Sequence, residues 1–202
     1  MIGNTNTKLS YFVHWHPALW TPAIRWLVGD TRRFVGKRVL DLGCGHGRMS
    51  CLFGLLGATV QGVDLDPKNV AVAREEVARW NLGDRVQIAA CDGDPLHMPG
   101  SNYDFAFTKS VLVVVPDVDT FIAGLSQKLK PGAELMFAEN LGGAFLKMLR
   151  FGILHRRDKA FERSFHGVDQ AFLTAVSRQV DMVEYKQYYG LVAAIRARKR
   201  FE

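Results

Sequence analysis

The first residues in this sequence whose types and spacing indicate ligand binding are three glycines and an acidic residue just before them. Residues 39–47 read Val-Leu-Asp-Leu-Gly-Cys-Gly-His-Gly, an apolar run that contains Asp41 and leads into a helical pattern. Gly43, Gly45 and Gly47 would let the backbone approach a ligand, and the N-terminus of the following helix favours a negative group. The spacing predicts a nucleotide-type ligand at this loop.

A second acidic residue, Asp64, ends the next apolar run. It lies 21 residues after Gly43, where a carboxylate can accept hydrogen bonds from both hydroxyls of a ribose. A nicotinamide dehydrogenase would show the same loop and the same acid. These two features therefore leave the enzyme class open.

The elements that must position these residues alternate along the chain. Short apolar runs are separated by helical patterns, which is typical of βαβ units and a parallel sheet. The predicted strands cover residues 37–42, 58–63, 86–90, 103–108, 134–138, 180–188 and 191–197. The predicted helices cover residues 17–28, 47–56, 67–81, 118–129 and 169–178, and Lys130-Pro131-Gly132 is the stop signal of the fourth. We expect an α/β fold, a mostly parallel seven-stranded sheet that ends in an antiparallel hairpin, with helices on both faces.

Taken together, the motifs of residues 37–140 resemble the class I S-adenosylmethionine-dependent methyltransferases, particularly their small, type 11-like branch. The matching segments are the glycine-rich run 39–47, the ribose acid Asp64 in Gln61-Gly-Val-Asp-Leu65, the acid Asp92 in Cys91-Asp-Gly-Asp, and the turn Leu129-Lys-Pro-Gly-Ala133. His97 stands where the family usually has Pro, and Ala133 replaces the second Gly of the turn. The resemblance implies a Rossmann-like methyltransferase fold.

The resemblance also implies S-adenosyl-L-methionine as cofactor and S-adenosyl-L-homocysteine as product. A sulfonium cofactor has no phosphates, so the loop would meet its amino acid moiety, whose carboxylate benefits from the helix N-terminus. Asp92 would accept from the adenine amine, a role for which a dehydrogenase has no use. The expected cofactor-binding residues are Asp41, Gly43, Cys44, Gly45, Gly47, Asp64, Leu65, Asp92, Gly93, Met98 and Thr108. For Asp41 two roles stay open, organisation of the loop or cofactor amine and capping of the strand end.

Methyl transfer is an in-line displacement, so the protein mainly positions the acceptor and excludes water. A general base helps if the acceptor is a hydroxyl. The candidates are His14 and His16, because an N-terminal segment often covers the cofactor in the family that the chain resembles. The expected acceptor contacts are Lys109, Glu139, Asn140 and Arg150. His97 is either a further acceptor contact or a loop histidine that faces solvent.

The residues after the fourth predicted strand disfavour two kinds of methyltransferase. Residues 108–111 read Thr-Lys-Ser-Val, whereas enzymes that methylate DNA bases carry an N/D-P-P-Y/F signature there. Metal-dependent catechol enzymes need an acid at the same strand end, and Lys109 is its opposite in charge. His14 and His16 have no acid beside them that would complete a metal site. We expect no metal and no nucleic acid partner.

The sequence therefore predicts a metal-independent methyltransferase of a small molecule. The expected acceptor is a hydroxyl of a sugar or natural product, with an anionic acceptor as one variant. Nitrogen methylation and methylation of a lipid-linked acceptor at a membrane surface stay open as alternatives. An alternative of another class is a noncatalytic, cofactor-binding partner subunit.

Charge and cysteine content bear on organisation and location. The net charge is +6, and residues 141–166 hold six cations and two anions, a local net of +4, which suits either an anionic acceptor or a membrane surface.

We expect a single domain with an N-terminal helical lid (1–36), a cofactor-binding core (37–140), a basic acceptor lid (141–166) and a C-terminal helix and hairpin (167–202). Three cysteines without a CxxC pair, no signal-like N-terminus and no long apolar run predict a cytoplasmic protein with at most peripheral membrane contact. The sequence does not predict an oligomeric state.

Overall fold

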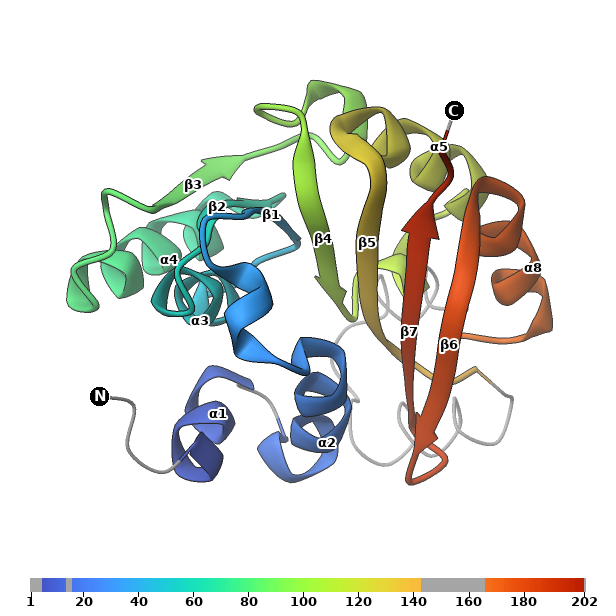
Figure 1. The fold of residues 1–202 in the computed structure, drawn as a ribbon, viewed down its shortest axis with the longest axis horizontal. Helices are drawn as coiled ribbons and strands as arrows, with labels where there is room; N and C mark the ends of the chain where they lie inside the picture. Colours follow the sequence, from blue (N-terminus) through green and yellow to red (C-terminus); the bar gives the residue numbers. More distant parts are fainter. Residues whose placement is uncertain (1–4, 14–15, 143–165, 202) are drawn as a thin grey trace.

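One sheet forms the centre of the protein. The computed structural model describes residues 5–13, 16–142 and 166–201. Within these residues seven strands follow the spatial order β3-β2-β1-β4-β5-β7-β6 (Figure 1). They span β1 Arg38–Leu42, β2 Thr59–Asp64, β3 Val86–Ala90, β4 Tyr103–Lys109, β5 Leu129–Asn140, β6 Val180–Tyr188 and β7 Val192–Lys199.

The pairing of these strands confirms the predicted sheet. β1 to β5 pair in parallel, and β7 runs antiparallel to both β5 and β6. Parallel strands are covered on both faces, so they consist of nearly continuous apolar runs. In β1, for example, each of the residues after Arg38 is buried, including Asp41.

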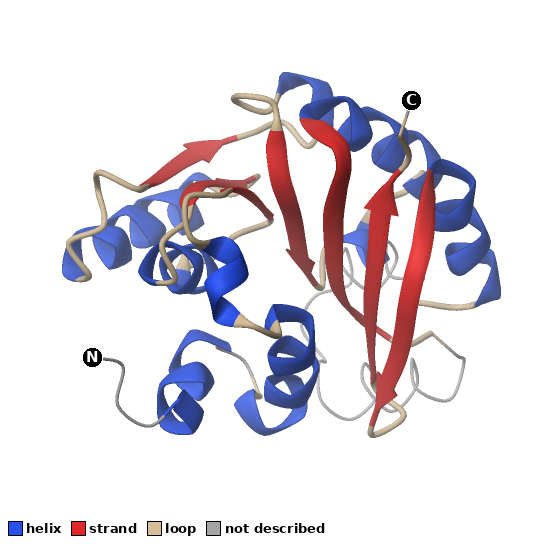
Figure 2. Cartoon of the chain, viewed as in Figure 1, coloured by secondary structure: helices blue, strands red, loops and turns tan. Residues whose placement is uncertain are grey.

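Helices cover both faces of the sheet, as predicted (Figure 2). The α-helices are α1 Thr5–Val13, α2 Pro17–Val28, α3 Arg48–Leu55, α4 Pro67–Arg79, α5 Val118–Lys128 and α8 Gln170–Gln179, and the short 3-10 helices are η1 Thr31–Phe34, η2 Pro95–His97 and η3 Leu112–Val114. Residues of α1 to α4 share one buried cluster with Val39 and Phe107. Residues of α5 and α8 share a second cluster with Leu40 and Phe137. Because neighbouring strand residues point to opposite faces, these two clusters lie on the two sides of the sheet.

The fifth strand is longer than its sequence pattern predicts. The expected strand was 134–138, whereas β5 begins at Leu129 and includes the Lys-Pro-Gly stop signal. Leu129 pairs with Tyr103 and Glu134 pairs with Phe105, so residues 130–133 bulge out of the ladder. The bulge accommodates Pro131, which has no N–H to donate. The stop signal still ends α5, whose last residue is Lys128.

The N-terminal helices lie at the end of the sheet towards which the arrow of β4 points (Figure 1). α2 has the predicted bounds, and α1 precedes it. Residues 143–165 of the predicted basic lid are outside the described residues, as are His14 and Arg150. The division of the chain into two lids and a core therefore stays a prediction.

Candidate active site

The glycine-rich loop joins the end of β1 to the start of α3. Gly45 and Gly47 have φ angles of 53° and 73°, which residues with side chains rarely adopt. A Cβ atom at Gly47 would lie 2.8 Å from the Cβ of Ala73 in α4, so this glycine lets the loop pack against the protein. A Cβ atom at Gly45 would meet no atom within 4 Å. Gly45 is therefore the position where the loop backbone faces open space.

The first two residues of the loop are held by the protein itself. A Cβ atom at Gly43 would collide with the side chain of Val111. Cys44 is buried, and its N–H donates to the carbonyl of Val63 at 2.9 Å. Burial raises the pKa of the Cys44 thiol, which therefore stays protonated. Both residues shape the loop against its neighbours.

The carboxylate of Asp64 connects the end of β2 to the loop. Its Oδ2 accepts from the N–H of Gly45 at 2.8 Å, and its Oδ1 accepts from the Asp66 N–H and the Asn69 Nδ2, both at 3.0 Å. A carboxylate has about four acceptor sites, so about one stays for a ligand hydroxyl. Asp64 thus lies where the sequence predicts the ribose acid, with its orientation fixed by three donors.

The register between β2 and β3 brings Asp92 close to Asp64. Asp64 pairs with Ala90, and the backbone N–H of Cys91 donates to the Asp64 carbonyl at 3.0 Å. Asp92 follows directly, at the start of the loop after β3. Two acids that are 28 positions apart in the sequence therefore stand at neighbouring strand ends.

An exposed apolar side chain lies beside these acids. Leu65 is 65% exposed, and a Cβ atom at Gly93 would lie 3.3 Å from its Cδ2, so the loops after β2 and β3 touch at this point. Apolar surface next to a carboxylate suits a flat base with a polar edge. Met98 is buried in the cluster that includes α5, and its expected contact with the base stays a prediction.

Asp92 forms an ion pair with His97. The Nδ1 of His97 lies 2.7 Å from Oδ2 of Asp92, and the Asp94 N–H donates to the other carboxylate oxygen at 3.0 Å. The hydrogen bond from His97 lowers the pKa of Asp92, and the same bond raises the pKa of His97. The two side chains are 59% and 67% exposed, so water weakens the pair. His97 is thus an exposed loop histidine, with a carboxylate partner that the sequence pattern did not indicate.

Asp41 lies underneath the loop. It is 2% exposed, and it accepts a hydrogen bond of 2.5 Å from the hydroxyl of Ser50 in α3. Burial raises the pKa of Asp41 to about 7, because the charged form loses its hydration there. The contact joins β1 to α3 on either side of the loop. The geometry favours loop organisation over a direct contact with a ligand.

A buried polar network closes the ends of β4 and β5. The hydroxyl of Thr108 donates to Glu139 Oε1 at 2.6 Å, and the N–H groups of Val111 and Leu112 donate to the same oxygen at 3.3 Å. Burial raises the pKa of Glu139 to about 7. Thr108 and Glu139 have no exposed surface, and the direct contacts predicted for them stay predictions. Their hydrogen bonds hold the turn after β4.

Two further expected acceptor contacts lie beside this network, the half-buried Lys109 and the buried Asn140. The amine of Lys109 stands 4.5 Å from the ring centroid of Trp20 in α2. Burial lowers the pKa of Lys109 to about 8. The Nδ2 of Asn140 donates to the hydroxyl of Ser110 at 3.0 Å. The sequence placed Trp20 in a helix of aromatic residues but gave no signal that it would meet Lys109.

The two histidines proposed as general bases, His14 and His16, precede α2 in the sequence. His16 is exposed and begins α2 with a φ angle of 49°, and it makes no side-chain cap. His14 lies outside the described residues, as does Arg150. A role of either histidine in proton transfer stays a prediction.

The structure adds one contact that no motif indicated, between α1 and the helices that follow the loop. The hydroxyl of Tyr11 donates to Oε1 of Glu76 in α4 at 2.5 Å, and Nη1 of Arg48 donates to the Tyr11 carbonyl at 2.9 Å. The Nε1 of Trp80 donates to the same glutamate oxygen at 2.9 Å. α1 is thereby attached to the first residue of α3, directly after the glycine-rich loop.

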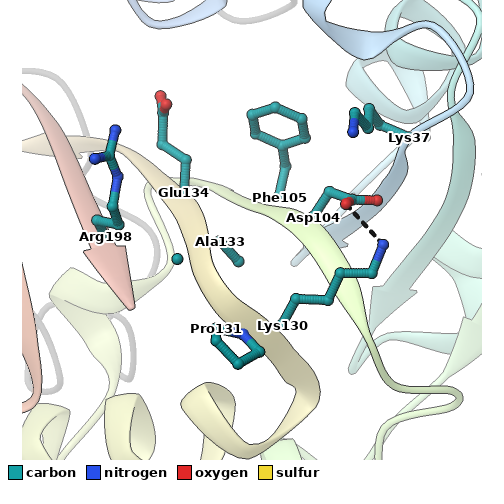
Figure 3. A pocket seen from close by; sticks show the side chains of 9 residues that line it. Lys37, Asp104, Phe105, Lys130, Pro131, Ala133, Glu134 and Arg198 are labelled. Carbon is teal, nitrogen blue, oxygen red and sulfur yellow. Dashed lines mark hydrogen bonds and ion pairs between the residues drawn. The ribbon is translucent and has the colours of Figure 1, made fainter. Parts of the chain in front are cut away.

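One cavity opens among the starts of the strands, and Figure 3 shows the side chains that line it. It has a volume of about 230 Å³ and is lined by the starts of β1, β4 and β5, including Phe105, Lys130 and Glu134. The amine of Lys130 pairs with Asp104 at 2.7 Å on its wall. Strand starts and strand ends lie at opposite edges of a parallel sheet, so this cavity is separate from the loop of Gly45.

The described residues contain no group of three or more His, Cys, Asp or Glu side chains that could hold a metal ion. Among the described helices, none combines the length and the apolar character needed to cross a bilayer.

Comparison with known proteins decides the family. The methyltransferase domain family matches residues 40–137. A ubiquinone biosynthesis O-methyltransferase of Brucella anthropi is 36% identical over 110 residues, which is 54% of this chain and 43% of that protein. A crystal structure of an S-adenosylmethionine-dependent methyltransferase from Mesorhizobium loti superposes with a TM-score of 0.71 at 20% identity, over 90% of this chain and 98% of that one. Residues 40–137 belong to the methyltransferase domain family, and the fold is that of the class I S-adenosylmethionine-dependent methyltransferases. The predicted family and cofactor are confirmed.

The fold by itself leaves the chemistry open. The cyclase SpnF has a similar fold, with a TM-score of 0.67 at 16% identity over 91% of this chain and 93% of that one. This chain also spans less than half the length of the curated methyltransferase from Brucella anthropi. The activity of this methyltransferase family member must therefore be argued from its site.

Proposed function

We propose that this protein transfers a methyl group from S-adenosylmethionine to a hydroxyl of a small molecule, without a metal ion. The observation that carries the proposal is the meeting of four features at one edge of the sheet: the open backbone at Gly45, the carboxylate of Asp64, the exposed Leu65 and the carboxylate of Asp92. S-adenosylmethionine has a part to match each feature: an amino acid for the loop, a ribose for Asp64 and an adenine for Leu65 and Asp92. The names of the curated relatives support oxygen as the methylated atom.

Each of these residues would hold one part of the cofactor. The loop around Gly45 receives the amino acid part at the start of α3, and Asp64 accepts from a ribose hydroxyl. Asp92 accepts from the adenine amine, the N–H of Gly93 donates to a ring nitrogen, and Leu65 covers one face of the ring. When bound, the cofactor supplies a methyl group activated by a sulfonium. Gly43, Cys44, Gly47 and Asp41 keep the loop in shape.

The acceptor would bind at the ends of β4 and β5, next to the loop. Lys109 and Asn140 have side-chain groups at this edge, and Thr108 and Glu139 hold the turn that carries them. Helices α1 and α2 lie over the same end of the sheet and would exclude water from the transfer. The predicted basic lid and its Arg150 would complete the acceptor site.

One observation favours a lipid-linked acceptor as a second candidate. The Brucella anthropi relative reported above is named for ubiquinone biosynthesis. Residues 141–166 combine apolar residues with a local net charge of +4, which suits the surface of an anionic membrane. Binding to anionic vesicles, lost in a variant with Arg150, Arg156 and Arg157 neutralised, would support this candidate.

Calorimetric titration with S-adenosylmethionine and, separately, with NADH tests the proposed cofactor. We expect binding of S-adenosylmethionine only. Incubation with a small-molecule extract should then form S-adenosylhomocysteine and a product heavier by one methyl group. Binding without any such product would favour the noncatalytic partner subunit, and no binding would contradict the proposal.

A further inference from the structure

The amine of Lys109 belongs to the turn that packs directly on the glycine-rich loop. Thr108 pairs with Leu42 across β4 and β1, so Lys109 follows beside the first residue of the loop. Val111, two residues later, fills the space over Gly43. The residue at the end of β4 therefore faces the same edge of the sheet as the open backbone of Gly45.

The surroundings of this amine are apolar on one side. The ring of Trp20 lies 4.5 Å from Nζ, and Nζ makes no hydrogen bond or ion pair with another described residue. Glu139 in the neighbouring strand β5 acts electrostatically on the Lys109 amine. The Oε2 of Glu139 is buried without a hydrogen-bond partner among the described residues. An ammonium group with so few partners is poorly solvated.

We propose that the amine of Lys109 accepts the proton of the acceptor hydroxyl as the methyl group is transferred. This proposal rests on the proposed function. In the step, the acceptor O–H bond breaks and an N–H bond forms on Lys109, while the methyl carbon leaves sulfur and bonds to the acceptor oxygen. The positive charge of the sulfonium is lost and an ammonium appears, so the total charge is unchanged. The face of Trp20 stabilises that ammonium by a cation–π contact.

The pKa of Lys109 indicates which kind of acceptor hydroxyl this amine can deprotonate. Burial lowers its pKa to about 8, against the small opposite effect of Glu139. Roughly a tenth of such an amine is neutral at pH 7, whereas an ordinary lysine is almost fully charged. A base of this strength suits a phenolic hydroxyl, whose pKa is about 10, better than the far less acidic hydroxyl of a sugar. The inferred acceptor is a phenol.

The first test measures the titration of Lys109 itself. Protein with isotope-labelled lysine is followed by carbon NMR from neutral to alkaline pH, and the Lys109 signal is the one missing in Lys109→Arg. We expect a midpoint near pH 8 for Lys109. A midpoint for Lys109 at the ordinary lysine value of about 10.4 would overturn the proposal.

The second test compares two phenols as acceptors. At pH 8 para-methoxyphenol is still protonated and needs a base, whereas para-nitrophenol is largely ionised and does not. Lys109→Met should lower kcat for para-methoxyphenol by about 10² to 10⁴-fold, change kcat for para-nitrophenol only a few-fold, and leave the affinity for S-adenosylmethionine unchanged. Lys68→Met should match the wild type with both phenols.

The other outcomes each count against the proposal. Equal losses with both phenols would assign Lys109 to positioning, and full activity of Lys109→Arg with para-methoxyphenol would assign it a charge role. The same phenol-dependent loss in His16→Ala would move the base to α2. A wild type that binds S-adenosylmethionine but methylates neither phenol overturns the phenolic acceptor, whereas a wild type that does not bind it contradicts the proposed function.

Discussion

The two halves of the candidate site are built in opposite ways. At the ends of β2 and β3, the carboxylates of Asp64 and Asp92 accept hydrogen bonds from backbone N–H groups. These donors either lie a few positions away in the sequence or belong to the neighbouring loop, and Leu65 between the two acids is exposed. At the ends of β4 and β5, Glu139 is fully buried and its donors come from residues 108–112, while the amine of Lys109 lies against Trp20 of α2. The cofactor half is a surface made by local motifs, and the acceptor half is a buried network made by the fold.

This difference follows from what each half would bind. Every member of the family uses one cofactor, so short motifs with fixed spacing are sufficient to hold it. An acceptor must be held beside a reacting methyl group with water excluded, which requires buried polar groups whose donors come from elsewhere in the chain. The predictions below test whether the two halves behave as separate units.

Removal of the Asp64 carboxylate should have the largest effect, and only on the cofactor half. Asp64→Ala should weaken S-adenosylmethionine binding by about 2 to 4 kcal/mol, because a ribose hydroxyl loses a charge-assisted partner and the Gly45 N–H loses its acceptor. Titration calorimetry measures the effect. Asp117→Ala, which removes the side-chain cap of the distant helix α5, is the matched control and should keep the affinity of the wild type. Equal affinities for Asp64→Ala and the control would contradict the cofactor assignment.

The buried Glu139 should make the stability of the protein depend on pH. Its pKa is raised from 4.5 to about 7 in the folded protein, so between these values the folded state binds more protons than the unfolded state. The free energy of unfolding should therefore fall as the pH rises through this range, by about 2 to 3 kcal/mol from Glu139. Urea unfolding at several pH values measures the slope.

Glu139→Gln should flatten part of this slope, since the amide keeps the shape and does not titrate. Asp41 contributes in the same direction, because its pKa is also raised to about 7, so Asp41→Asn is the comparison. A slope in Glu139→Gln as steep as in the wild type would show that the carboxyl group is ionised in the folded protein at low pH.

The Asp92 carboxylate should matter less than that of Asp64, because it is exposed and already paired with His97. Asp92→Ala should weaken S-adenosylhomocysteine binding by roughly 5- to 30-fold. The same variant should bind S-inosylhomocysteine, which lacks the adenine amine, as well as the wild type does. Asp94→Ala, a neighbouring acid on the same loop, is the control. An equal loss for both ligands would assign Asp92 to the loop structure.

The contrast between the halves also explains what the sequence could and could not predict. Each βα unit carries its own apolar period, cap and turn, so the strand and helix ranges and the places of Asp64 and Asp92 were predicted from short segments. The bulge in β5 was not, because it depends on pairing between Leu129 and Tyr103. Burial of Thr108 against Glu139 and the contact of Lys109 with Trp20 join positions 31 and 89 residues apart. No local pattern encodes such contacts.

Chelation should have the smallest effect, and it bears on the acceptor half alone. Metal-dependent methyltransferases of catechols place an acid at the end of β4, and this chain has Lys109 there, with the nearby Glu139 held by three donors and withdrawn from the surface. A cation at that position would face an ammonium group, so the proposed transfer uses a proton acceptor instead. We expect methylation of para-methoxyphenol to be unchanged after dialysis against EDTA, and magnesium to add nothing. The Lys109→Met protein is the informative comparison, because loss of the ammonium removes the charge that would repel a cation. Activity that is lost with EDTA and restored by magnesium in the wild type would show that the acceptor half binds a metal, and that Lys109 does not replace one.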